Sequence, residues 1–580
     1  MKIRSQLSVA VPWSLTHYIP LNGFHPLYQA LFDERPGGIQ LNAIDNVKLS
    51  KALQSDELLR QCLVRRVRSV KFKSADFRIT NLGRRYCSYF DRTNFVLTEL
   101  LPGQVEFHHT APFPSLRRPF VFHCESFLPV FYPSAHQGTR PFRRFKSLRE
   151  QYSKIFSMDE CLGIFSHIPE TLSSLSRFFG NSLVDRKLLF SHIGISKHAF
   201  PIAAKEKLPL SPTFRALFIN SAHQNPASFF LRGGHIVLRF WKELRQRGTD
   251  GHLYMRCCRP TDDELVKNGV DPEFVKVETG RSVIWIENYL SNKELNALMG
   301  SVHFMLLPSA SLHSVSIMQA MALGAIPVVT DTVGTSRYVR DEEDGIVLKG
   351  VRRARWFTDP HTDIEFDHFS RDETLDASLI AQLTTRVLAL LQSPDAYERS
   401  RSRAMNRATK NFSGSQFSED FWGKVGDLYE RYKKTHPQCD SPILHSPSVG
   451  SNLVTDSDWS RLFEGPTQPT RRLSTGVGRV SEHSGGFIYT SGTPLMKIHD
   501  WSPMRAYIHW GAPRLQFSTT IKGLEGKFLE SKNARLRFIR ASLVRTVSRF
   551  LKPYPAIYKF CAQLLDVARR SYRAIFLARR

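Results

Sequence analysis

A group of small and hydrogen-bonding residues follows a buried apolar run near the middle of the chain. These residues are Ser309, Ser311, His313, Ser314 and Ser316. The apolar positions that come next, through Ile317 and Met321, are typical of a helix that ends at Gly324. Backbone N–H groups at the N-terminus of such a helix bind anions. The stretch therefore predicts a phosphate-binding site without a Walker-type lysine.

Short buried strands flank this loop and helix. The residues before Pro308 and the run Ile326–Val329 are apolar and of strand length. A glycine turn at Gly334 and an acidic turn at Asp344–Gly345 follow before another strand. This alternation predicts a parallel sheet, in which ligands bind at the carboxyl ends of the strands.

The stretch from Leu306 to Gly350 resembles the donor-site signature of the GT-B glycosyltransferases, specifically the large retaining family 4. The shared positions are Pro308–Ser309, Ala320–Met321–Ala322, Gly324, Pro327–Val328–Val329, Gly334, Tyr338–Val339 and Asp344–Gly345. Ser311 and Gln319 stand where the family has two acids. A minority branch carries His-Ser-Val-Ser and Gln-Ala-Met here, as this chain does. The resemblance implies an α/β fold of two Rossmann-like domains facing across a cleft, and a nucleotide-sugar donor.

The resemblance assigns most donor contacts to the second half of the chain. Arg232, beside Gly233, takes the place of the family's lysine, and arginine binds a diphosphate in bidentate fashion. Gln319 replaces the glutamate that accepts from ribose hydroxyls, and Glu287 lies in the base-contacting loop. Ser311 and His313 are expected to face the sugar. The other implied donor residues are Gly23, Asn220, Ser221 and, through their N–H groups, Ser314, Val315 and Ser316.

Two residues in the first half are the implied catalytic pair. The segment Pro119–Glu125 resembles the family's strand that ends in a histidine hydrogen-bonded to the donor sugar. His123 is therefore the expected catalytic residue, with Glu125 as an acceptor-side base or orienting group. His108–His109 is a rival for this role. Because the chain has 21 histidines, a structural role at a strand end is the alternative for each of them.

Strand and helix patterns alternate in two successive halves, which predicts domains at residues 1–205 (acceptor) and 206–434 (donor). Strands are expected at Leu7–Val11, Val105–His108, Phe120–His123, Cys161–Ser166, Arg215–Asn220, His252–Arg256, Val283–Ile286 and Val302–Leu307. Helices are expected near His25–Phe32, Glu170–Phe179, Ile236–Arg247, Asn292–Met299, Leu379–Leu391, Ala396–Lys410 and Phe417–Lys433.

The C-terminal part of the chain changes in composition. Residues 435–530 form a Ser-, Pro- and Gly-rich linker and an irregular segment, and 531–580 is a basic amphipathic helical tail whose one acid is Asp566. Such a tail either lies on an anionic membrane surface or packs on the enzyme as a hairpin with a basic rim. Nucleic-acid contact is a weaker alternative, because no aromatic-interleaved motif accompanies the charge.

Length and composition narrow the protein class. A chain of 580 residues with 42% hydrophobic residues holds two globular domains, and a net charge of +27 favours anionic partners. Eight cysteines without a CxxC pair indicate a reducing compartment. No signal peptide is recognisable and no run of 18 apolar residues occurs, so we expect a cytoplasmic protein. Peripheral attachment to the inner face of a membrane is compatible with this expectation.

These features predict a glycosyltransferase that moves a sugar from a nucleotide-sugar to a glycan or lipid-linked acceptor. Independence of metals and cofactors, and retention of anomeric configuration, are implied by the family. The alternative is a catalytically silent GT-B scaffold or binding module, which the two missing acids favour. The donor sugar, its base and the acceptor are not encoded in any pattern that one sequence reveals.

Overall fold

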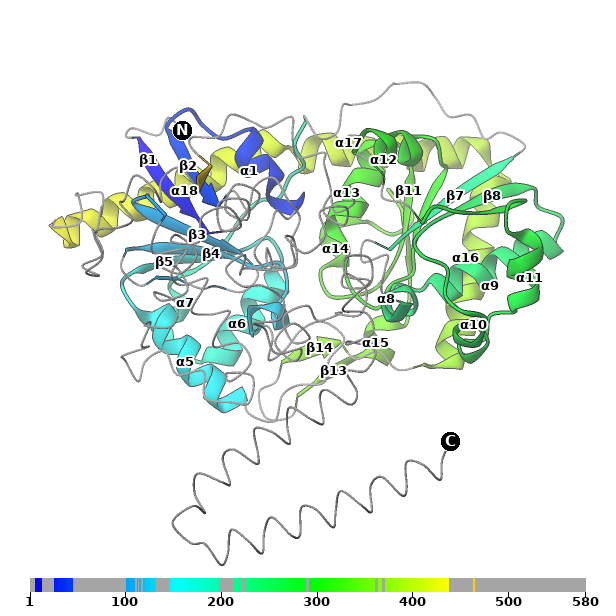
Figure 1. Cartoon of the computed structure of the whole chain (residues 1–580), viewed down its shortest axis with the longest axis horizontal. Coiled ribbons are helices and arrows are strands. Elements are labelled where there is room, and N and C mark those ends of the chain that lie inside the picture. The colour runs from blue at the N-terminus through cyan, green and yellow to red at the C-terminus, as the bar shows by residue number, and fades with distance from the viewer. Residues whose placement is uncertain are drawn as a thin grey trace, which may run out of the picture.

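Two α/β domains lie side by side in the computed structural model (Figure 1). The structure describes residues 6–12, 26–44, 101–109, 112, 114–115, 118–131, 145–197, 213–220, 226–287, 290, 292–359, 364–367, 371–437 and 463–464. Each domain is built on a mainly parallel sheet, which confirms the predicted α/β fold class.

The first sheet has the order β15-β2-β1-β3-β4-β5-β6. Its parallel strands are β1 (Leu7–Val11), β2 (Ile39–Ile44), β3 (Val105–His109), β4 (Phe120–His123), β5 (Cys161–Ser166) and β6 (Leu188–Phe190). Every residue of β3, β4 and β5 is buried, as expected for strands covered on both faces. The helical segments of this domain are η1 (Pro26–Tyr28), α1 (Gln29–Asp33), η3 (Leu128–Phe131), α5 (Phe145–Ser157), α6 (Pro169–Phe179) and α7 (Ser182–Asp185).

The second sheet has the order β12-β11-β10-β7-β8-β9, which is the doubly wound Rossmann order. Its strands are β7 (Phe214–Ile219), β8 (Gly251–Arg256), β9 (Val283–Trp285), β10 (Phe304–Leu307), β11 (Ile326–Thr330) and β12 (Ile346–Leu348). The order reverses between β7 and β10. Ligands of such sheets bind at this reversal, outside the carboxyl ends of the strands.

The helices of the second half cover both faces of its sheet (Figure 1). They are α8 (Pro226–Leu231), α9 (Gly234–Gln246), α10 (Asp262–Lys267), α11 (Pro272–Glu278), α12 (Asn292–Gly300), α13 (Ser314–Ala322), α14 (Thr335–Tyr338), α15 (Val351–Arg355), α16 (Glu373–Leu391) and α17 (Pro394–Asn411). An antiparallel pair, β13 (Trp356–Thr358) with β14 (Glu365–Asp367), lies at the boundary with the first domain.

The last long helix, α18 (Gly414–Thr435), crosses back and packs on the first domain (Figure 1). Its Trp422 is fully buried and donates from Nε1 to the Leu31 carbonyl at 2.8 Å. One hydrophobic cluster also joins Val9 of the first sheet to Met318 and Met321 of α13. The sequence-based division at 205 and 434 follows chain order, whereas packing assigns α18 to the first domain.

The regions beyond α18 are described only in part. β15 (Phe463–Glu464), within the segment expected to be irregular, pairs antiparallel with β2. The basic tail at 531–580 lies outside the described residues. Helix α16 is long and apolar enough to cross a membrane by composition alone, but it packs against α9 with Leu379 and Leu383 buried in the core of the second domain.

Candidate functional site

The predicted phosphate loop occupies the strand-order reversal of the second sheet. Pro308–His313 follows β10, and Asn220 follows β7 next to it in the sheet. The Asn220 side chain is fully buried, and neither its nitrogen nor its oxygen makes a hydrogen bond in the part of the chain described. An unsatisfied buried amide at this edge is typical of a group that pairs with a ligand.

Helix α13 directs its N-terminus into this site. Its first backbone hydrogen bond runs from the Ile317 N–H to the His313 carbonyl at 3.1 Å. The N–H groups of Ser314, Val315 and Ser316 therefore have no acceptor within the helix, and they carry the positive end of its dipole. A recess of about 180 Å³, open mouth included, lies at this end of the helix, with Ser311, His313 and Ile317 in its wall.

Arg232 and His313 are brought together, although 80 residues separate them in the chain. The His313 Nε2 lies 2.8 Å from the Ser309 hydroxyl. Burial, and then the positive charge of Arg232, lower the pKa of His313 well below its ordinary value. The imidazole is therefore neutral at physiological pH, and the fixed positive charge beside the helix N-terminus belongs to Arg232.

Gly233 allows the Arg232 turn to dock on the phosphate loop. Its φ is +80°, and a Cβ there would lie 2.1 Å from the Pro308 carbonyl oxygen. The Ala310 N–H donates to the Leu231 carbonyl at 3.0 Å beside this contact. Only glycine combines this backbone conformation with so close an approach.

The other predicted donor residues show no comparable contact with the phosphate loop among the described residues. Gln319 lies in α13, half-buried, and its amide makes no hydrogen bond among the described residues. Glu287, after β9, is exposed and accepts from the Arg259 N–H at 3.0 Å. Gly23 and Ser221 lie outside the described residues.

The carboxyl edge of the first sheet carries a row of histidines. His109 and His123 end the neighbouring strands β3 and β4 in register, and His167 follows β5. The rings of His123 and His167 stack with centroids 5.3 Å apart, and His123 Nε2 lies 3.4 Å from His167 Nδ1. This pairing brings His167, which sequence reasoning missed, next to the expected catalytic residue.

Tyr28 and Glu125 extend the histidine pair into a chain of four polar groups. The Tyr28 hydroxyl lies 3.0 Å from His123 Nδ1. At the other end, His167 Nε2 lies 3.5 Å from Glu125 Oε1. Burial, and then the Glu125 charge, raise the pKa of Tyr28 well above its ordinary value, so its hydroxyl keeps its proton.

One assignment of protons satisfies the Tyr28–His123 and His123–His167 links, while the His167–Glu125 contact at 3.5 Å is longer than a hydrogen bond. A protonated Tyr28 donates to His123 Nδ1, which leaves the proton of His123 on Nε2, facing His167 Nδ1. His167 then carries its proton on Nε2, toward the carboxylate. The chain ends at Glu125, whose side chain is 20% exposed, whereas His123 and His167 are fully buried. Glu125 is therefore the member that reaches solvent.

The rival histidine, His108, belongs to a buried ionic cluster. Its Nε2 bonds the buried Glu106 carboxylate at 3.0 Å, and Arg118 Nε bonds the other oxygen at 2.9 Å. Burial works to raise the pKa of Glu106, but the His108 hydrogen bond and the Arg118 charge outweigh it and lower the pKa. This cluster ties β3 to the turn before β4, and its residues do not line either recess described for this structure.

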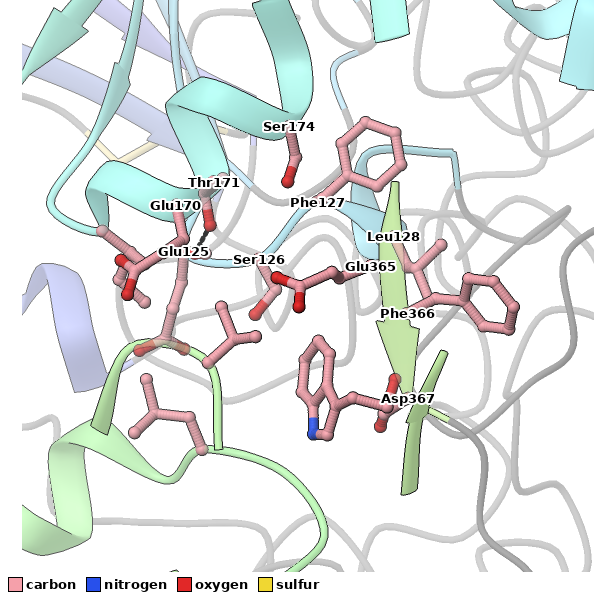
Figure 2. Close-up of a pocket in the computed structure, with 14 residues that line it drawn as sticks. Glu125, Ser126, Phe127, Leu128, Glu170, Thr171, Ser174, Glu365, Phe366 and Asp367 are labelled. Atoms are coloured by element: carbon pink, nitrogen blue, oxygen red, sulfur yellow. Dashed lines mark hydrogen bonds between the residues drawn. The ribbon is translucent and has the colours of Figure 1, made fainter. Parts of the chain in front are cut away.

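A recess of about 500 Å³, open mouth included, separates the two domains beside Glu125 (Figure 2). The first domain contributes Glu125, Ser126, Phe127, Leu128, Ile168, Glu170, Thr171 and Ser174, and the second contributes Leu312, Val333, Trp356, Glu365, Phe366 and Asp367. Leu312 lines both this recess and the smaller one at the helix N-terminus. The phosphate loop and Glu125 thus border adjoining spaces.

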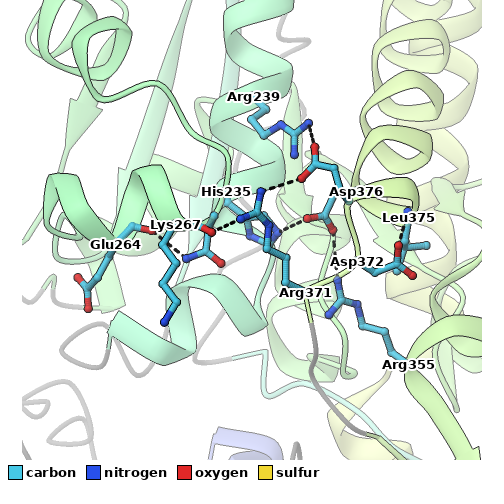
Figure 3. A network of polar contacts seen from close by, with 11 residues as sticks. His235, Arg239, Glu264, Lys267, Arg355, Arg371, Asp372, Leu375 and Asp376 are labelled. Carbon is cyan, nitrogen blue, oxygen red and sulfur yellow. Dashed lines mark hydrogen bonds and ion pairs between the residues drawn. The ribbon is translucent and has the colours of Figure 1, made fainter.

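A buried ionic network holds the helices behind the Arg232 turn (Figure 3). Asp376 of α16 binds His235 of α9 at 3.1 Å and Arg355 of α15 at 3.2 Å. All three side chains are nearly fully buried. Burial works to raise the pKa of Asp376, but the hydrogen bond from His235 and the charge of Arg355 outweigh it and lower the pKa. The network fixes α9, which begins at Gly234, and α15, which leads into Trp356.

Comparison with known proteins agrees with the fold and the loop. Residues 231–356, about a fifth of the chain, match the family model described as glycosyl transferases group 1. This match confirms the family resemblance over the segment that carries the phosphate loop and Arg232. No curated protein sequence matches the chain.

Several solved glycosyltransferase structures are similar to this chain. HepE of Anabaena in complex with UDP and glucose is 10% identical, with a TM-score of 0.42, over 73% of this chain and 100% of HepE. A glycosyltransferase from Rickettsia africae is 12% identical, with a TM-score of 0.44, over 74% and 99%. WaaG, involved in lipopolysaccharide biosynthesis, is 12% identical, with a TM-score of 0.43, over 73% and 99%. At such low similarity, residue roles rest on the geometry of this chain alone.

The close approach at Gly233 predicts a local effect of Gly233→Ala. The alanine Cβ must displace the Pro308 carbonyl and with it the phosphate loop, so we expect a loss of stability of about 2–3 kcal/mol and weakened nucleotide binding. Gly248→Ala is the matched control, because Gly248 has a φ of +78° but nothing within 4 Å of an added Cβ. Urea unfolding of both variants measures the difference, and equal losses would contradict the steric account.

The buried network predicts a large effect of Asp376→Asn. Arg355 then loses its buried counter-charge, so we expect a loss of about 3–5 kcal/mol in unfolding free energy. Asp250→Asn removes an exposed pair with Arg245 and should cost less than about 1 kcal/mol. Because the pKa of Asp376 is lowered, its stabilisation is present above about pH 3.9 and is lost as pH falls through the folded-state pKa. The unfolding free energy measured across this pH range should therefore change less with pH for Asp376→Asn than for the parent protein.

Proposed function

We propose that the protein is a glycosyltransferase that moves a sugar from a nucleotide-sugar to a hydroxyl of a glycan or lipid-linked acceptor. The observation that carries the proposal is the meeting of two unlike sites at Leu312. On one side lie the α13 N-terminus and Arg232, which suit a diphosphate. On the other lies Glu125, a carboxylate that suits a hydroxyl.

The second domain supplies the donor site. The N–H groups of Ser314, Val315 and Ser316 hold the diphosphate, and Arg232 offsets the charge that develops as it departs. Because these groups are fixed by the fold, they need no reorganisation during the reaction. Gln319 and the buried amide of Asn220 are the proposed partners of the nucleoside or sugar hydroxyls.

The first domain supplies the acceptor side. Glu125 accepts a hydrogen bond from the attacking hydroxyl, and His167, which stacks on His123, lies beside the carboxylate. The acceptor oxygen bonds to the anomeric carbon as the bond from that carbon to the diphosphate oxygen breaks. The diphosphate leaves with the electron pair, and the hydroxyl proton passes to it. His123 acts through His167 and is a positioning residue in this mechanism.

Further properties follow from the family resemblance. Transfer is proposed to retain the anomeric configuration, and to proceed without a metal or cofactor because Arg232 and a helix N-terminus stabilise the leaving group. A cytoplasmic location at the inner face of a membrane fits the basic segment 531–580 and a lipid-linked acceptor. Liposome flotation of the chain with and without that segment tests the membrane part.

A silent scaffold is the second candidate function, since Ser311 and Gln319 lack the charges of the family's acids. Such a scaffold would have no use for a carboxylate beside a buried histidine pair and close to the phosphate loop. Turnover distinguishes the two functions. An enzyme releases nucleoside diphosphate from its donor, and a scaffold at most binds it.

Nucleotide binding should depend on Arg232. The protein is screened by thermal shift against UDP, GDP, ADP and their common sugars. The nucleotide that it recognises, at about 100 times its Kd, should add ~2.7 kcal/mol to the stability of the protein. We expect Arg232→Ala to abolish this shift and Arg247→Ala, an exposed change at the far end of α9, to keep it. A shift that persists in Arg232→Ala would contradict the donor site.

Catalysis should depend on the charge of Glu125. Glu125→Gln keeps the shape of the side chain but is a weaker acceptor, so we expect nucleoside diphosphate release from the nucleotide-sugar to fall by about 100-fold. Its nucleotide thermal shift should be unchanged. Glu150→Gln on the exposed face of α5 serves as the control. Release within twofold of the parent rate would contradict the acceptor-side role.

A further inference from the structure

The recess beside Glu125 is lined by the hydroxyl of Ser174. Ser174 is 6% exposed and makes no hydrogen bond within the described residues. Figure 2 shows its oxygen directed into the recess. The oxygen is open to the recess and not enclosed by protein, so a ligand in the recess can bond it. The recess therefore offers a hydroxyl to a polar molecule.

Carboxylates from both domains face the same space. Glu125 and Glu170 come from the first domain, and Glu365 and Asp367 from β14 of the second (Figure 2). Glu365 is fixed by Arg352 at 2.7 Å. Ionised carboxylates only accept hydrogen bonds, so Glu125 and Glu170 bind hydroxyl donors and repel anions, whereas Arg352 offsets the charge of Glu365. No lysine or arginine occurs among the described residues that line the recess.

An aromatic ring completes the lining. Trp356 is half-buried, and its Nε1 donates to the Ala310 carbonyl at 3.2 Å, which holds the ring against the phosphate loop. Leu312 and Val333 extend this apolar wall. A sugar ring has the matching surface, since its C–H groups form an apolar face and its hydroxyls a polar rim. Sites of this kind pair apolar walls with a few polar groups that fix orientation.

We propose that this recess binds one uncharged sugar ring, rich in free hydroxyls, as the acceptor subsite. The acceptor role rests on the proposed function, but the binding chemistry does not. Ser174 and Glu170 bond ring hydroxyls, Trp356 covers one face, and Glu125 receives the reactive hydroxyl. A phosphate or carboxylate on that ring is rejected. Any anionic part of a lipid-linked acceptor must therefore lie outside the recess.

Saturation-transfer NMR on the full-length protein tests the chemistry with matched probes. Methyl glucoside, galactoside and mannoside are compared with the corresponding hexose 6-phosphates. We expect at least one neutral glycoside to bind, with its phosphorylated counterpart about tenfold weaker or undetectable. Equal binding of the two, or no binding of any neutral glycoside at tens of millimolar, overturns the inference.

Two variants assign any binding to this recess. Glu170→Lys should weaken binding of the neutral sugar, and it should reduce or reverse the preference for the neutral sugar over its phosphate. Asp185→Lys, the same charge change at an exposed position of α7, should leave both unchanged. Ser174→Ala removes only a hydroxyl and should lower sugar affinity about fivefold or more without loss of stability. Sugar binding unaffected by Ser174→Ala and Glu170→Lys overturns the assignment.

The nucleotide screen separates this inference from the proposed function. A normal nucleotide shift combined with failure of the sugar tests refutes the neutral-sugar subsite and leaves the glycosyltransferase proposal intact. Selective sugar binding without any nucleotide response supports the neutral-sugar subsite and refutes the glycosyltransferase proposal.

Discussion

The site depends on how tightly the loop Pro308–His313 is held at the strand-order reversal of the second sheet. Gly233 packs on the Pro308 carbonyl, and the Trp356 indole donates to Ala310 at 3.2 Å. A backbone bond to Leu231 fixes the same loop from a third direction. Because the loop is anchored on several sides, the N-terminus of α13 and the side chain of Leu312 have fixed positions. Both recesses take their shape from this loop.

The two sides of the site solve opposite electrostatic problems. In the proposed reaction the donor side must hold a diphosphate, a task we assign to a helix N-terminus with Arg232, whose charge also helps to keep His313 neutral. In the proposed reaction the acceptor side must attract a hydroxyl, a task we assign to Glu125, with two buried histidines behind it. Replacing the family's acids with Ser311 and Gln319 leaves the donor side with less negative charge near the leaving group. The replacement is therefore compatible with diphosphate binding.

Much of the fold could be predicted from the sequence, because buried parallel strands are short apolar runs whose carboxyl ends carry polar residues. Leu7–Val11 and Cys161–Ser166 form strands at the expected bounds. The pairing of Arg232 with the phosphate loop was likewise predictable from the resemblance to the glycosyltransferase family. His167 was not, since its role arises from stacking across neighbouring strands. Nor was Trp356, because a residue of the second half that completes a recess of the first leaves no local pattern.

Hydrogen exchange of the full-length protein, with and without a saturating nucleoside diphosphate, tests the central claim most directly. The account predicts slower exchange in peptides covering 308–319 and 229–236, where backbone N–H groups bind the diphosphate or pack on the loop that does. It predicts no change at 262–278, where α10 and α11 lie away from the loop on the far side of the domain (Figure 1). Unchanged exchange at 308–319 with a bound nucleotide would contradict the assignment of the donor site.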